Sequence, residues 1–188
     1  NIIIQLGIKN IKINTFYLKE EINKYIYNNK FNCKIKIIED GKSILNTGGG
    51  IVNLIKNSVE ENFLVFNPDT IWNKEYIEEI KRMESFYLQK KIKNILLVVN
   101  KEKSFDKKLK GDFELNSKNI LNYENKKFIF TGCQIINKNV FSLNEIKNFS
   151  INEIWSELIK KKELYGFESF NNFKHVTDLE IFKKISKN

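Results

Sequence analysis

A run of three glycines is the first stretch whose residue types could take part in chemistry. Thr47-Gly48-Gly49-Gly50 stands where an apolar helical pattern begins, and consecutive glycines suit a backbone that needs positive φ or a close approach. Exposed N–H groups at the start of a helix favour an anion or the edge of a base. No Gly-Lys-Ser/Thr follows, so the block is not a Walker loop. The alternative is a flexible turn before the helix.

A second candidate is Asp69, which follows the apolar run 63–66 and the pair Asn67-Pro68. A carboxylate just past the carboxyl end of a buried strand is well placed to bind a hard divalent cation. Mg²⁺ prefers one or two carboxylates together with phosphate oxygens. The alternative is an aspartate that only shapes a turn or caps a helix.

Two further candidates are His175, the only histidine of the chain, and the pair Gly111-Asp112. An imidazole can bind a metal ion or move a proton near neutral pH, but a single histidine is also a common structural residue. A Gly-Asp pair before apolar residues is equally consistent with an ordinary turn that enters a hairpin.

Apolar periodicity predicts strands that alternate with helices, which is typical of an α/β fold with a mostly parallel central sheet. The predicted strands are 8–16, 34–38, 63–66, 95–99 and 164–167, and the predicted helices lie over 18–26, 47–55 and 76–83. The continuous apolar runs 63–66 and 95–99 suggest central parallel strands. Ligands of such sheets bind outside the carboxyl ends of the strands, so Asp69 lies where chemistry is expected.

The second half of the chain has a different pattern. Short apolar segments at 113–115, 120–123 and 128–130, separated by polar turns, predict an antiparallel meander added to the parallel sheet. Ser150-x-x-Glu153 and Thr177-x-x-Glu180 are capping-box patterns, and each predicts the start of a helix.

Composition sets the class of protein. The 188 residues are 41% hydrophobic, enough for the core of one domain over 1–188 and too apolar for a disordered chain. The net charge of +9 comes almost wholly from lysines spread along the chain, and no alanine occurs. That pattern indicates codon bias more than a specific nucleic-acid site, for which clustered arginines are typical. A basic polyanion-binding module stays an alternative.

The lack of a visible targeting signal and the pattern of the two cysteines predict a cytoplasmic protein. We expect no transmembrane helix, because no run of about 18 apolar residues occurs, and no signal peptide is visible. Cys33 and Cys133 lack a CxxC spacing and are predicted to be small buried hydrophobes. The chain opens inside an apolar stretch, from which we expect an N-terminally truncated fold.

The motifs, in their order along the chain, resemble those of the sugar-1-phosphate nucleotidyltransferases. The likeness spans nearly the whole chain and is strongest to the N-acetylmuramate-1-phosphate uridylyltransferase and mannose-1-phosphate guanylyltransferase-like branch. It rests on residues 8–15, Asn46-Thr47-Gly48-Gly49-Gly50-Ile51, Val65-Phe66-Asn67-Pro68-Asp69, Gly111-Asp112-Phe113 and Phe130-Thr131-Gly132.

The resemblance implies a Rossmann-like three-layer fold and a reaction in which an NTP and a sugar 1-phosphate give an NDP-sugar and pyrophosphate. It implies Mg²⁺ as cofactor, no membrane partner, and direct attack by the sugar phosphate on the α-phosphorus without a protein nucleophile. By the motif match Asp69 is the catalytic metal ligand. Thr47, Gly48, Gly49, Gly50 and Asn67 bind the nucleotide, and Gly111, Asp112, Thr131 and Gly132 line the sugar phosphate.

Three departures from the family pattern stand out. The glycine-rich signature with its Arg, which normally grips the triphosphate, is absent from the sequence given. Pro68 replaces the glycine of Asn-Gly-Asp, which fixes φ and removes an N–H. His175 stands where a second metal-binding aspartate is expected, and Asp178 could replace it only if the chain slips locally. These departures keep a second interpretation open, a non-catalytic nucleotide-sugar or phosphosugar-binding domain descended from such enzymes.

Overall fold

The computed structural model describes residues 2–56, 58–141 and 146–187, and the chain divides into two compact units. The first consists of residues 1–61 and 138–156, and the second of residues 62–137 and 157–188. The prediction of one domain over 1–188 stays a prediction.

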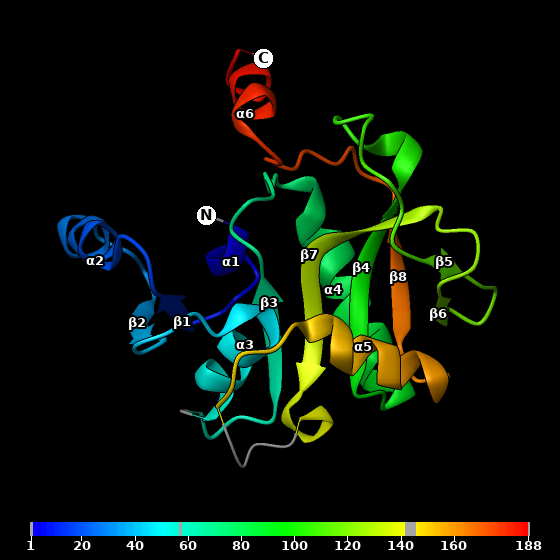
Figure 1. The fold of residues 1–188 in the computed structure, drawn as a ribbon, viewed down its shortest axis with the longest axis horizontal. Coiled ribbons are helices and arrows are strands. Elements are labelled where there is room, and N and C mark those ends of the chain that lie inside the picture. The colour runs from blue at the N-terminus through cyan, green and yellow to red at the C-terminus, as the bar shows by residue number, and fades with distance from the viewer. Residues whose placement is uncertain (1, 57, 142–145, 188) are drawn as a thin grey trace. The chain divides into compact units, whose positions relative to one another are not determined.

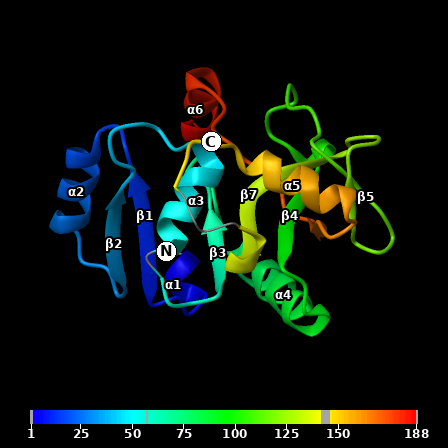
Figure 2. The same cartoon turned by 60° about the horizontal axis from the view of Figure 1, so that its bottom comes forward.

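The first unit is built on two parallel strands, β1 (Asn10–Thr15) and β2 (Lys34–Glu39). Their isoleucines share a register, with Ile11 opposite Ile35 and Ile13 opposite Ile37. The helix α2 (Lys19–Asn28) connects the two strands and packs against β2, while α3 (Asn46–Lys56) packs against β1 (Figure 2). The other elements are α1 (Ile2–Gln5), the 3-10 turn η2 (Lys138–Val140) and the start of α5 (Ile151–Lys160).

The second unit contains a four-stranded sheet in the order β3-β7-β4-β8 (Figure 1). β3 (Asn62–Phe66) pairs antiparallel with β7 (Phe128–Asn137), β7 pairs antiparallel with β4 (Asn94–Asn100), and β4 pairs parallel with β8 (Tyr165–Ser169). The helix α4 (Glu75–Lys90) packs against β4 and β8. The hairpin of β5 (Glu114–Leu115) and β6 (Leu121–Asn122), the turn η1 (Lys101–Lys103) and α6 (Leu179–Ser186) complete the unit.

The core of the second unit lies around β4. All five residues from Ile95 to Val99 are fully buried, because β4 has a hydrogen-bonded strand on each side and α4 against it. Glu79 joins α4 to the end of β8, where its carboxylate accepts hydrogen bonds from the Ser169 hydroxyl at 2.5 Å and the Phe170 N–H at 2.9 Å.

The predicted α/β class is confirmed, and the direction of some strands differs from the expectation. The run 63–66 is an edge strand that pairs antiparallel within the described residues, whereas a central parallel strand was expected. An apolar run shows that a strand is covered on its faces, but carries no information about the direction of its partner. The predicted short strand 128–130 is the start of the ten-residue β7. As the predicted meander requires, β5 pairs antiparallel with β6 and Phe113 bridges antiparallel to Phe128.

Other local predictions can be compared with the structure. Cys133 is fully buried, as expected for a small core residue, and burial raises the pKa of its thiol. Cys33 is partly exposed. In the described part of the chain, no helix combines the length and the apolar character needed to cross a membrane.

Stability should depend on β4. Replacing Leu97 with Ala removes a wholly buried side chain and should lower the free energy of unfolding by about 2–5 kcal/mol, through lost transfer energy and the cavity left behind. The matched control is Leu88→Ala on α4, where the side chain is 58% exposed and the expected loss is under about 0.5 kcal/mol. Urea denaturation of both variants measures the difference, and equal losses would contradict this assignment of the core.

Candidate functional site

Asp69 and His175 lie side by side in the second unit, although 105 positions separate His175 from Thr70, the neighbour of Asp69. The Val176 N–H donates to the Asp69 carbonyl at 2.8 Å, and the Ile71 N–H donates to the Lys174 carbonyl at 2.9 Å. These bonds form a short antiparallel bridge centred on Thr70 and His175. It leaves the Nδ1 atom of His175 3.7 Å from the Oδ1 atom of Asp69.

The segment that carries His175 is fixed on its other side as well. Phe173 bridges to Ser104, with the Phe105 N–H donating to the Phe173 carbonyl at 2.8 Å and the Phe173 N–H to the Lys103 carbonyl at 3.0 Å. The Phe173 ring is buried and stacks on the His175 ring, with centroids 5.7 Å apart and planes inclined by 12°. The imidazole therefore has a defined position.

A bulge in β7 forms the surface beneath this pair. The register between β4 and β7 shifts between Leu96 and Val98, opposite the stretch of β7 that contains Thr131 and Gly132. Gly132 has a φ of +89°, and its carbonyl accepts from the Asn67 N–H at 2.8 Å. Bulges of this kind bend a strand and are frequent beside active sites.

Two threonines connect the bulge to His175. The Thr131 hydroxyl donates to the Leu97 carbonyl at 2.9 Å and is fully buried. The Thr70 hydroxyl donates to the Thr131 carbonyl at 2.7 Å and lies 3.4 Å from Nδ1 of His175. The Thr131 side chain is thus hydrogen-bonded within the sheet, while the Thr70 side chain lies against the histidine.

The Asp69 carboxylate is only partly satisfied by protein groups. Its Oδ1 atom is buried and accepts no hydrogen bond within the described residues, although the side chain as a whole is 45% exposed. The nearby indole of Trp72 packs edge-on against Phe66 and Tyr76. No set of three His, Cys, Asp or Glu side chains that could bind a metal ion by itself occurs in the described ranges.

Asp112 belongs to the same unit and is tied to the start of β7. Its Oδ2 atom accepts from the Phe130 N–H at 2.9 Å. Surrounding protein atoms desolvate the carboxyl and raise its pKa, while the Phe130 N–H and the charge of Lys126 oppose that shift. The residue keeps an open side toward solvent. Gly111 is needed because the Lys126 carbonyl would collide with a Cβ atom there.

Asp178, the alternative to His175, is committed elsewhere. Its carboxylate accepts from the Ile181 N–H at 2.8 Å and caps α6. Thr177 was the predicted cap, but its hydroxyl donates to Asp106 at 2.9 Å. The local slip that would bring Asp178 to Asp69 is therefore absent, and His175 is the group that faces Asp69.

The glycine block lies in the first unit, inside α3. Gly48 and Gly49 donate their N–H groups to the Phe149 carbonyl at 3.0 and 3.2 Å. The Phe149 ring and the Lys147 carbonyl would collide with side chains at these two positions, and Asn14 lies 2.8 Å from where a Cβ of Gly50 would be. Close packing thus accounts for all three glycines, and the Thr47 hydroxyl accepts from the Ile151 N–H at 3.1 Å. Nucleotide binding by this block stays a prediction.

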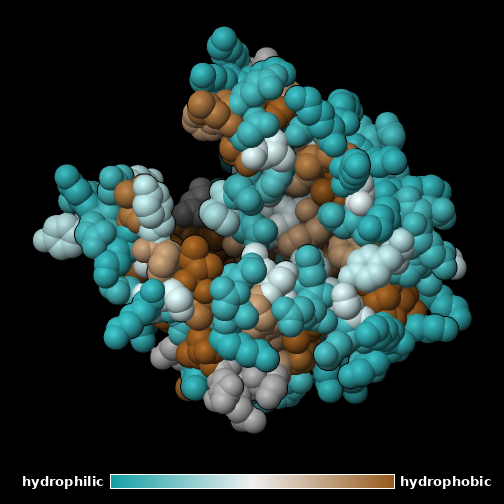
Figure 3. Space-filling model, in the orientation of Figure 1, coloured by the Kyte–Doolittle hydropathy of each residue, from teal (hydrophilic) through white to brown (hydrophobic). Residues whose placement is uncertain are grey.

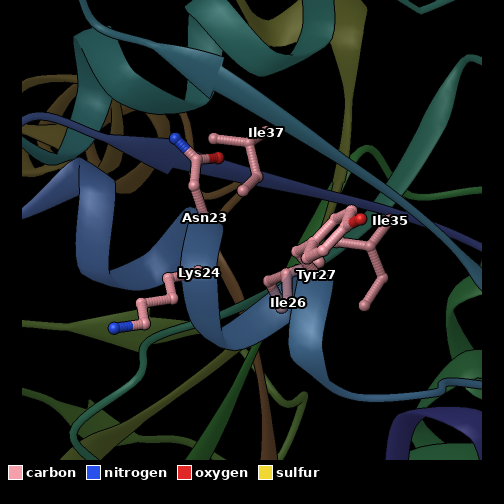
Figure 4. A pocket seen from close by; sticks show the side chains of 6 residues that line it. All are labelled: Asn23, Lys24, Ile26, Tyr27, Ile35 and Ile37. Atoms are coloured by element: carbon pink, nitrogen blue, oxygen red, sulfur yellow. The ribbon is translucent and has the colours of Figure 1, made fainter.

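A shallow hollow between α2 and β2 is not a candidate for chemistry. Figure 4 shows its lining, which consists of Asn23, Lys24, Ile26, Tyr27, Ile35 and Ile37. It contains no acidic or histidine side chain and none of the predicted site residues.

Comparison with known proteins bears directly on the family resemblance. The chain is 25% identical over 189 residues to the D-glycero-alpha-D-manno-heptose 1-phosphate guanylyltransferase of Aneurinibacillus thermoaerophilus, which covers 96% of this chain and 78% of the relative. The crystal structure of HddC from Yersinia pseudotuberculosis matches with a TM-score of 0.74 and 19% identity, over 99% of this chain and 81% of that chain. The resemblance to the sugar-1-phosphate nucleotidyltransferases is confirmed.

Further solved structures share this nucleotidyltransferase fold. HddC complexed with GMP-PN matches with a TM-score of 0.75 and 20% identity, over 99% of this chain and 81% of that chain. The inositol-1-phosphate CTP transferase from T. maritima matches with a TM-score of 0.71 and 13% identity, over 99% and 79%. No protein-family model matches the chain.

The structure thus brings together part of the residue set that the family resemblance predicted. Asp69, His175, Asn67, Thr131 and Gly132 meet at one place in the second unit. Thr70 was not predicted as part of the site, although it contacts both Thr131 and His175. A threonine that follows an aspartate carries no signal of its own, but its position just after the end of a predicted strand was a reason to consider it.

The bulge should tolerate no side chain at Gly132. Gly132→Ala places a Cβ atom 2.9 Å from Asn67 in a backbone with positive φ and should lower the free energy of unfolding by about 1–3 kcal/mol. The matched control is Gly41→Ala, where φ is +91° and nothing lies within 4 Å. Thermal unfolding should show a larger loss for Gly132→Ala, and equal losses would mean that backbone strain alone matters.

The Asp106 carboxylate, which accepts hydrogen bonds from the Lys108 N–H and the Thr177 hydroxyl, should make a pH-dependent contribution to stability. The hydrogen bond from the Lys108 N–H lowers the pKa of Asp106. Burial of the carboxyl acts in the opposite direction, and the hydrogen bond from the Thr177 hydroxyl lowers the pKa further. A carboxyl whose pKa is lowered on folding stabilises the fold above its unfolded pKa of about 3.9, and this is lost as the pH falls through the folded value. When the pH is lowered from about 6 to about 3, the free energy of unfolding should therefore fall less in the Asp106→Asn variant than in the unmodified protein. Equal falls in the two proteins would contradict this role of Asp106.

Proposed function

We propose that this chain transfers a nucleoside monophosphate from an NTP to a sugar 1-phosphate, giving an NDP-sugar and pyrophosphate. The observation that carries the proposal is the partly satisfied Asp69 carboxylate at the end of β3, held against His175 by backbone pairing. The similarity to a heptose 1-phosphate guanylyltransferase and to HddC supports the reaction class. A nucleotide triphosphate substrate also favours a cytoplasmic location.

The chemistry follows from positioning. A phosphate oxygen of the sugar 1-phosphate attacks the α-phosphorus, the bond from the α-phosphorus to the bridging oxygen breaks, and pyrophosphate leaves with the electron pair. Such a displacement needs alignment and charge stabilisation and no covalent protein nucleophile. Cys133 agrees with this, because its thiol is fully buried and burial raises its pKa.

A divalent cation would supply charge stabilisation between the phosphates, and Mg²⁺ is the ion that the family resemblance implies. The Asp69 carboxylate suits Mg²⁺, which prefers oxygen ligands. The group opposite it is an imidazole nitrogen, which suits Mg²⁺ poorly. The donor set of this chain therefore fits Mg²⁺ only in part, and the proposed displacement is written without a step that passes through the ion.

The remaining assignments concern the two substrates. We propose that Thr47, Gly48, Gly49, Gly50 and Asn67 bind the nucleotide, and that Gly111, Asp112, Thr131 and Gly132 line the sugar phosphate. For the residues of the second unit, the support is that Gly132 is hydrogen-bonded to Asn67 and lies close to Thr70, so that both backbone groups are near Asp69. For Thr131 the contribution would come from the backbone, since its hydroxyl binds Leu97.

A second candidate function is binding without catalysis. Pro68 and His175, which replace a glycine and an aspartate of the family pattern, favour it. Calorimetry with an NDP-sugar separates the two functions, because a binding domain would bind the product and show no synthesis with any pair of NTP and sugar 1-phosphate.

Activity should depend on Asp69. We expect Asp69→Asn to lower the rate of pyrophosphate release at least about a hundredfold, the usual cost of losing one charge-stabilising group. The assay uses the protein encoded by its gene, with the four NTPs and several sugar 1-phosphates. The control is Glu84→Gln, an exposed carboxylate on α4, which should retain full activity. A folded Asp69→Asn variant with undiminished turnover would overturn the proposed role.

A further inference from the structure

We infer that the cation site at Asp69 selects a nitrogen-binding divalent ion, Mn²⁺ or Co²⁺, over Mg²⁺, with Nδ1 of His175 as a direct ligand. The inference rests on the proposed function for the phosphates that would complete the coordination. It goes beyond that function because it concerns which ion this chain binds and through which atom.

The separation of the two donor atoms suits one shared ion. The Nδ1 atom of His175 lies 3.7 Å from Oδ1 of Asp69, which is too long for a hydrogen bond. Two ligands that each lie about 2.1 Å from one ion are about 3.0 Å apart when they are adjacent and about 4.2 Å apart when they are opposite. The observed separation falls between these two values, so a shift of under about 1 Å would bring the two donors to either arrangement.

The hydrogen bonds around the pair leave the space between these two atoms without a donor from Thr70. The Thr70 hydroxyl lies 3.4 Å from Nδ1 and donates its hydrogen to the Thr131 carbonyl, so toward Nδ1 it can only accept. In the tautomer that carries its hydrogen on Nε2, the lone pair of Nδ1 is therefore not used by Thr70. The buried Oδ1 atom of Asp69 accepts no hydrogen bond from any described residue. In that tautomer Nδ1 of His175 and Oδ1 of Asp69 are two electron-rich atoms 3.7 Å apart, and a metal ion bound between them would stabilise both.

The pair is also rigid enough to discriminate among ions. Backbone hydrogen bonds fix Asp69 to Val176 and Ile71 to Lys174, and the Phe173 ring stacks on the imidazole. Asp178 cannot move in as a second carboxylate without giving up the cap of α6. The ion therefore meets one carboxylate and one imidazole.

Such a mixed donor set favours particular metals. Mg²⁺ is small, prefers oxygen ligands and loses water reluctantly. Imidazole nitrogen binds later first-row metals more strongly, and affinity rises from Mn²⁺ to Co²⁺. Exchanging an aspartate for a neutral imidazole also removes one negative charge, which costs Mg²⁺ more than ions that gain from the nitrogen bond.

Because His175 is the only histidine of the chain, isotope labelling tests the ligand directly. The complete protein is loaded with Mn²⁺ and inorganic triphosphate, a probe without nitrogen, and electron spin-echo modulation is recorded. We expect a directly coordinated ¹⁴N signal that changes to the ¹⁵N pattern when only histidine is ¹⁵N-labelled. Absence of Mn²⁺ binding, or a spectrum unchanged by the label, overturns the inference without any variant.

Ion preference is measured by the Mg²⁺ concentration that displaces half of the bound Mn²⁺. The wild-type protein should require an excess of Mg²⁺ over Mn²⁺, and His175→Asp should lower that excess at least about tenfold, the lower limit seen when even outer-shell partners of a metal are changed. Equal ratios in two folded proteins contradict the inference. Turnover with Mg²⁺ together with no ¹⁴N coupling would support the proposed function and overturn the inference about His175. Coupling without any turnover would support the inference and overturn the proposed function.

Discussion

Backbone pairing between residues 69–71 and 174–176 is the interaction on which the candidate site depends. Two hydrogen bonds, from Val176 to Asp69 and from Ile71 to Lys174, hold together segments that are far apart in sequence. Because the main chain sets this alignment, the Asp69 carboxylate and the imidazole of His175 meet without a direct hydrogen bond between them. The positions of the two side chains are therefore set by the paired backbone segments.

A second constraint is the extra length inserted into β7. Without the register shift opposite Leu97, the strand would continue straight past Asn67 and Thr70. Gly132 allows the chain to turn there, since its backbone is in a region that side chains rarely adopt. The bulge and the paired segments together form a rigid support, and the hydroxyl of Thr70 connects one to the other.

The family resemblance predicted that Asp69 and His175 would be neighbours, while residue types and periodicity were enough to predict the class of fold and most strands and helices. They were not enough to predict how β3 pairs, because an apolar run is the same whether its neighbour runs parallel or antiparallel. They placed the last helix cap one residue early, at Thr177, because the competing partner Asp106 is distant in sequence. Asp178 took the cap in its place.

The glycines illustrate the same limit. Gly48, Gly49 and Gly50 were predicted to open a helix, and the structure places them in α3 with a neighbour at each that excludes a side chain. Nucleotide binding by these residues stays a prediction. A run of glycines indicates only that there is little room for side chains. The residues that fill this room come from distant segments, here Phe149, Lys147 and Asn14, and cannot be read from the run itself.

The segment that follows His175 is held by side-chain bonds of its own. α6 carries solvent-exposed apolar side chains, visible in Figure 3, with Leu179 66% and Phe182 51% exposed. Between this helix and the imidazole stand the capping bond of Asp178 and the bond from Thr177 to Asp106. Because the Asp178 cap moves with α6, the bond from Thr177 to Asp106 is the contact that would have to break before a displacement of this helix reached the paired segment 174–176.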